Sequence, residues 1–130
     1  MSALRSLLAA FADPLEAEEG HRSPAPFVYV TAIRSDAGLI RSLAGITLIC
    51  RQLGFDRDAE TLHSADATTA TYHAHHRDAA VAIAVEVCPP RQTVSVAVSG
   101  PDNAQVHHLF LQADQQLFGL CWRPWLAPPL

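Results

Sequence analysis

The order of strand and helix signals predicts an α+β fold, a two-layer sandwich with an antiparallel sheet and two long helices on one face. Three observations support this fold class. Short runs rich in β-branched residues alternate large and small side chains, two longer segments repeat apolar residues at helical spacing, and three of the strands follow one another through short connections. The expected sheet is a three-stranded meander plus an N-terminal strand, preceded by a short N-terminal helical arm.

The 130 residues divide into three parts by composition. Residues 1–12 predict a short amphipathic helix, because Leu4, Leu7, Leu8 and Phe11 recur at helical spacing. Residues 13–26 are acidic and then rich in serine and proline, which is typical of a linker. Residues 27–130 are expected to form a single α+β domain. The N-terminal helix could pack on this domain or on a partner chain.

The domain begins with FVYVTAI, residues 27–33, whose β-branched and aromatic side chains predict a strand. A long helix is expected over about 35–53, with Ser35 or Asp36 as the N-cap. Gly54 is expected to end this helix in the left-handed conformation. Apolar residues occupy a wide arc of the helix, so we expect most of its circumference to be covered.

Residues 56–66 are ambiguous between a short helix and an irregular connection. The three strands of the meander are then expected at about 68–75, 80–87 and 93–98. A final helix is expected from Pro101 to about Phe118, since proline is tolerated in the first turn of a helix.

The residues after Phe118 are expected to form a short edge strand and a proline-limited tail. Trp122 and Trp125 have two interpretations there. They could close one end of the core, or they could be exposed aromatic anchors for a partner.

A two-residue turn at Arg77 and Asp78 would pair His75 with Ala80 and Tyr72 with Ile83. Side chains alternate along a strand, so this register turns the valines of the meander toward the helices. The opposite face then carries small side chains and a single carboxylate: Thr69, Thr71, His73, His75, Ala82, Ala84, Glu86, Thr93, Ser95 and Ala97. An open sheet face usually carries long charged residues. We therefore expect another layer over this face: a second copy, the N-terminal helix or a partner protein.

His73 and His75 share this face, as two metal ligands on a strand must. In the expected register Glu86 lies opposite Thr69, roughly 13 Å from His73, and so cannot share a metal ion with it. The sequence leaves two interpretations open. The two histidines could be ordinary surface residues, or they could bind a transition metal in a small metal- or ligand-binding enzyme.

Composition limits the classes of partner. The net charge is −4, and the nine basic residues, all arginines, are scattered, which argues against nucleic-acid binding. No apolar run approaches the ~20 residues of a membrane span. Cys50, Cys88 and Cys121 form no C-x-x-C pair, as expected of reduced thiols in a cytoplasmic protein.

No motif in the sequence indicates a catalytic residue, and no cofactor is expected. The sequence therefore predicts a non-enzymatic binding or accessory module that acts through protein–protein contacts. We expect a homodimer formed by the small-residue face of the sheet.

Overall fold

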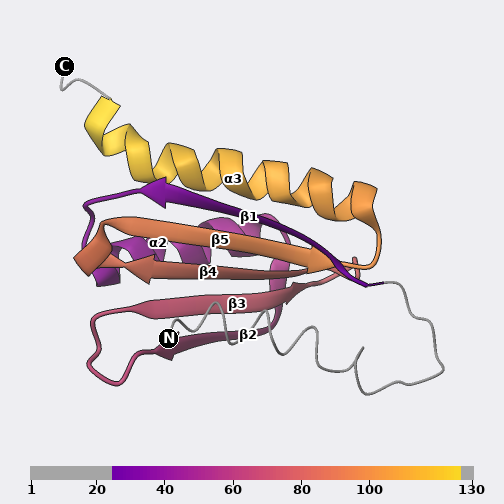
Figure 1. Cartoon of the computed structure of the whole chain (residues 1–130), viewed down its shortest axis with the longest axis horizontal. Helices are drawn as coiled ribbons and strands as arrows, with labels where there is room; N and C mark the ends of the chain where they lie inside the picture. The colour runs from indigo at the N-terminus through magenta and orange to yellow at the C-terminus, as the bar shows by residue number, and fades with distance from the viewer. Residues whose placement is uncertain (1–24, 127–130) are drawn as a thin grey trace.

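The computed structural model describes residues 25–126, with side chains described up to residue 118. The fold is α+β, with a five-stranded antiparallel sheet and two α-helices (Figure 1). The predicted N-terminal helix and most of the predicted linker lie outside the described residues. In chain order the elements are β1 (Phe27–Arg34), α2 (Leu39–Gln52), β2 (Phe55–His63), β3 (Ala70–His76), β4 (Ala82–Cys88), the 3₁₀ turn η1 (Pro89–Arg91), β5 (Thr93–Gly100) and α3 (Asn103–Leu126).

The sheet has the strand order β1-β5-β4-β3-β2, and every neighbouring pair is antiparallel. The predicted strand-helix-meander-helix order is therefore correct, but the meander has one more strand than expected. Residues 56–66 were ambiguous in the sequence, and most of them belong to β2. This strand lies at an edge and is exposed along almost its whole length, so it lacks the apolar alternation by which a strand is recognised.

Helix α2 begins at Leu39, later than expected. Its N-cap is Gly38, which has no side chain to cap the helix, so the predicted caps Ser35 and Asp36 are wrong. The Ser35 hydroxyl oxygen instead accepts a hydrogen bond from the backbone N–H of Ala37 at 3.2 Å, which stabilises the turn before the helix.

The end of α2 is as predicted. Gly54 has a φ of +97°, the left-handed conformation that glycine adopts without strain. A Cβ atom at this position would also lie 2.5 Å from the Nε2 atom of His76. Glycine is therefore needed both for the backbone conformation and for the close approach of the histidine ring.

Helix α3 continues beyond the end that the sequence predicts, and reaches Leu126. The edge strand expected after Phe118 is therefore wrong. A single glycine inside a helix costs only about 1 kcal/mol, and Gly119 does not end this one. Side chains beyond residue 118 are not described, so both interpretations of Trp122 and Trp125 remain predictions.

The apolar core combines one face of the sheet with one strip of each helix. The strip of α2 includes Ile46 and Cys50, and the strip of α3 includes Val106, Ala113 and Leu117. The side chains from β4 and β5 in this cluster are Ile83, Val85, Val87, Val94, Val96 and Val98, all at most 1 % exposed.

Helix α2 is less covered than the sequence predicts. Ile40 is 84 % exposed, and Leu48 is exposed on the same side of the helix. Of its residues only Ser42, Ile46 and Cys50 are buried. Within the described residues, neither helix combines the length and apolarity that a membrane crossing requires.

Tyr72 joins two strands from within the core. Its hydroxyl group donates a hydrogen bond to the backbone carbonyl oxygen of Phe55 at 2.8 Å, and both residues are buried. Burial is the main cause that raises the pKa of Tyr72. The neutral phenol therefore holds the start of β2 to β3.

We expect Tyr72→Phe to lower the free energy of unfolding by about 1–3 kcal/mol, because the buried Phe55 carbonyl loses its donor. Urea denaturation followed by circular dichroism measures this change. The matched control is Tyr29→Phe, which removes a hydroxyl that donates to Asn103 Oδ1 at an exposed position. We expect the control to cost less than about 0.5 kcal/mol. Equal losses in the two variants would contradict this role of Tyr72.

Candidate functional site

The β3–β4 hairpin differs from the expected register by two positions. His75 lies opposite Ala82 rather than Ala80, and Tyr72 lies opposite Val85 rather than Ile83. The connection is longer than the two-residue turn that the sequence suggested. Because the shift is even, every side chain of β3 and β4 keeps the face that the sequence assigned to it.

The face away from the core carries the predicted small residues. We define the small-residue face by its five most buried members, which are at most 7 % exposed: Thr71, Ala82, Ala84, Ala97 and Ser99. Ala82, Ala84 and Ala97 do not belong to the apolar cluster that contains the helices, so their burial is separate from that core. Ser99 was missed in the sequence because the strand was expected to end at residue 98.

The remaining predicted members of this face surround the buried centre. His73, Glu86, Thr93 and Ser95 are half-buried, and His75 is exposed. Thr69 is a correction: it precedes β3 and lies in the β2–β3 connection. Its backbone N–H donates to the Ser64 hydroxyl oxygen at 3.1 Å, so its role there is in the turn.

Thr71 is the polar centre of the small-residue face. It lies between Leu62 of β2 and Glu86 of β4 in the sheet register. Its Oγ1 atom is buried and has no hydrogen-bond partner among the described residues. A buried hydroxyl without a partner costs about 1–3 kcal/mol. A hydrogen-bonding group above this position would therefore be stabilising.

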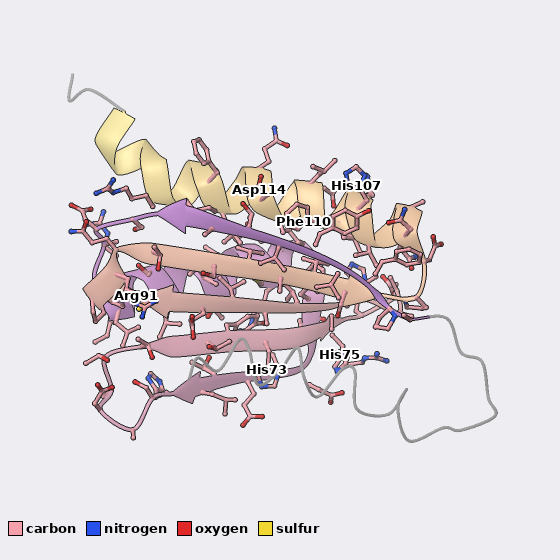
Figure 2. The ribbon with its side chains drawn as sticks, in the orientation of Figure 1. His73, His75, Arg91, His107, Phe110 and Asp114 are labelled. Carbon is pink, nitrogen blue, oxygen red and sulfur yellow. The ribbon has the colours of Figure 1, made fainter. Side chains whose placement is uncertain are left out.

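His73 and His75 lie on the same side of β3, as the sequence predicts (Figure 2). The structure adds a neighbour that the sequence did not reveal. Glu60 of β2 is paired with His73, and its Oε2 atom is 3.6 Å from His73 Nε2. The sequence does not predict the contact of Glu60 with His73, because its pattern does not identify β2 as a strand.

The position of Glu86 is also corrected. It lies opposite Thr71, two positions from His73, and not opposite Thr69 at four positions. The separation along the strands is therefore about 7 Å rather than 13 Å. Within residues 25–118, however, no group of three or more His, Cys, Asp or Glu residues is arranged to hold a metal ion. The metal ligands proposed from the sequence remain the pair His73 and His75.

His76 has a different role from its two neighbours. Its Nδ1 atom accepts hydrogen bonds from the backbone N–H groups of Asp78 and Ala79, both at 3.1 Å. Its Nε2 atom is 3.1 Å from the carbonyl oxygen of Leu53. An accepting Nδ1 requires the proton on Nε2, so the neutral ring donates to Leu53. His76 thus joins the β3–β4 turn to the end of α2.

Two further contacts stabilise this junction. The rings of His76 and Phe55 meet edge to face, with centroids 5.1 Å apart. Arg77 donates a hydrogen bond to the Asp56 carboxylate. The histidine triplet therefore contains two residues on the outer face and one residue that stabilises the fold.

Cys50 is the buried cysteine of α2, and burial raises the pKa of its thiol to about 12. The thiol is therefore protonated at neutral pH and is no nucleophile. Its role is packing in the core.

We expect His76→Ala to lower the free energy of unfolding by about 2 kcal/mol or more, because three backbone groups lose their partner. His75→Ala is the matched control, since it removes an exposed ring from the same strand. We expect it to lower the free energy of unfolding by less than about 0.5 kcal/mol. Urea denaturation measures both values. If His75→Ala were as destabilising as His76→Ala, the assignment of His76 would be wrong.

The site is thus a surface of small residues with a buried hydroxyl at its centre and a histidine–glutamate pair beside it. The sequence matches no protein-family model and no curated protein.

Proposed function

We propose that the chain is a non-enzymatic protein-binding module that associates with a second copy of itself through the small-residue face. One observation carries the proposal. The outer face of the central strands β3, β4 and β5 carries alanine, threonine and serine side chains, where a solvent-facing sheet usually carries long charged ones.

The proposal includes the two-layer arrangement and the cytoplasmic location predicted from the sequence. The contacts of α2 with β2, β3 and β4, and of α3 with β1 and β5, support two helices on one side of the sheet. Side chains from both helices join the same core cluster. The small-residue face is then the opposite side, where a second sheet would pack.

The chemistry of the face suits close packing of two sheets. Small side chains allow another sheet to approach. Two carboxylates border them, the partly buried Glu86 opposite Thr71 and Glu60 beside His73 at the β2 side. A two-fold axis would place the same surface of both copies in contact, which is the commonest arrangement in small dimers. The facing copy would also supply a hydrogen-bonding group to Thr71 Oγ1, whose lone hydroxyl otherwise destabilises the fold.

A second candidate function is the binding of a metal or small ligand by His73 and His75. The contact between His73 and Glu60 favours it, because a carboxylate beside an imidazole is a common pair of ligands. It needs further ligands from outside the described residues or from a second copy. Stoichiometric zinc, iron or copper in the purified protein, lost on His73→Ala, would support this function in place of the first.

Ala84→Arg should halve the mass of the assembly, because a long cation at the centre of the face prevents the approach of a second sheet. Sedimentation velocity at micromolar concentration measures the mass, and circular dichroism shows that the variant is folded. Ile40→Arg is the control, since it places the same charge at an exposed position of α2. A wild-type monomer, or an unchanged mass in Ala84→Arg, would contradict the proposal.

Thr71→Val gives a second test with almost no change in shape. If a second copy supplies the hydrogen bond, loss of the hydroxyl should weaken association by roughly 5- to 30-fold, equivalent to about 1–2 kcal/mol. If nothing binds Oγ1, the substitution should instead stabilise the free chain and leave association unchanged, and the proposed contact would be wrong. Analytical ultracentrifugation over a range of concentrations separates the two results.

A further inference from the structure

The two edge strands of the sheet, β1 and β2, differ in their ability to pair with a strand of another chain. β2 has register shifts between Phe55 and Arg57 and between Arg57 and Glu60, and Asp58 adopts a φ of +53°. It also carries several exposed charges over residues 56–60. Bulges and charges of this kind prevent an edge strand from pairing with another chain.

β1 has none of these features before its last residue. All eight of its residues are in continuous register with β5, and its one charged residue is the terminal Arg34. Val30 is 55 % exposed and Val28 is 43 % exposed. A regular, apolar and uncharged edge is a template for a further strand.

We propose that β1 pairs antiparallel with β1 of a second copy around a two-fold axis at Val30, so that the two sheets become one continuous sheet. In this register Val30 faces Val30 of the second copy, and Val28 faces Ala32. On the core side Tyr29 faces Thr31, and Phe27 faces Ile33. Each pair brings together two residues from the same face of the sheet, as antiparallel pairing requires.

The charge pattern is compatible with this axis. Arg34 lies opposite Pro26 of the second copy, so no charged residue faces another charged residue along the strand. An axis at Thr31 would place Arg34 opposite Val28, which is also uncharged, so the choice of Val30 rests on its exposure, the largest among the exposed apolar residues of β1. Like charges opposite each other destabilise a strand pair, and the proposed pair of β1 strands contains none.

Helix α3 extends the same contact. Tyr29 of β1 lies against His107 and Phe110 of α3, with ring centroids 5.1 and 5.6 Å from its own. Figure 2 labels these two residues of α3. Leu111 is the next residue of α3 and is half-exposed. Joining two β1 strands would bring this part of each α3 toward the two-fold axis and bury apolar surface beside the strand pair.

This contact uses the backbone edge of β1, whereas the small-residue face is defined on β3, β4 and β5. The two regions adjoin, because Val30 lies beside Ala97 in the sheet register. Cysteine cross-linking in the Ala84→Arg variant therefore tests the edge by itself. In antiparallel strands, opposite Cα atoms are 4.5–5.5 Å apart, within the range that a disulfide spans.

Under mild oxidation Val30→Cys should form a covalent dimer at least about ten-fold faster than Val28→Cys. Val28 is similarly exposed, but the two copies of residue 28 would be about 13 Å apart, too far for a disulfide. The wild-type protein gives the background rate of covalent dimer formation through its own cysteines. The cross-link should persist in Ala84→Arg, which alters only the small-residue face. Equal rates for the two cysteine variants would overturn the proposal.

Sedimentation gives the second measurement. Val30→Arg should halve the mass of the assembly, while Ile40→Arg should leave it unchanged. Because Val30 also lies beside Ala97 of the small-residue face, a halved mass supports the edge contact only together with a Val30→Cys cross-link that persists in Ala84→Arg. The double variant Val30→Arg with Ala84→Arg should be a monomer. If Val30→Arg alone keeps the wild-type mass, the proposed edge contact does not form. The proposed contact at the small-residue face is then tested separately by Ala84→Arg.

Discussion

The alternation of side chains along the central strand β4 is the constraint on which the rest of the structure depends. Ile83, Val85 and Val87 turn toward the helices and are fully buried in the core, while Ala82 and Ala84 turn the other way. Successive side chains point to opposite faces of a strand, so the alternation of large and small residues in β4 puts the large ones in the core and the small ones on the outer face. The same pattern continues in β5, and together the two strands define both the hydrophobic core and the proposed contact surface.

This constraint also explains which predictions from the sequence are correct. The faces of β3 and β4 were assigned correctly although the hairpin register was wrong, because a shift of two positions preserves every face. Gly54 was correct because few residues other than glycine adopt its φ. β2 was not predicted, since an exposed edge strand has no apolar period, and Glu60 was missed with it. The pair Glu60–His73 depends on contacts between strands, which a linear pattern does not contain.

The three clustered histidines, His73, His75 and His76, have different structural roles although they are close in the sequence. His73 and His75 follow the alternation of β3 and lie on its outer face, beside Glu60 of the neighbouring strand. His76 ends the strand, and its ring binds the backbone of the following turn and of the end of α2. The sequence pattern already separates His76, which it places at the turn, from His73 and His75 on one face. The hydrogen bonds of the His76 ring, which the pattern does not contain, assign this residue a role in the fold.

The unequal edges of the sheet limit how such a molecule could assemble. A two-fold contact between β1 strands uses that edge completely, and the bulges and charges of β2 prevent growth from the opposite edge. A sheet with two open edges would instead continue to add copies. A two-fold contact at the small-residue face is closed in the same way, because each copy uses the same patch that its partner uses. Each contact alone therefore closes at two copies, and the two together close at four copies when their two-fold axes intersect at right angles.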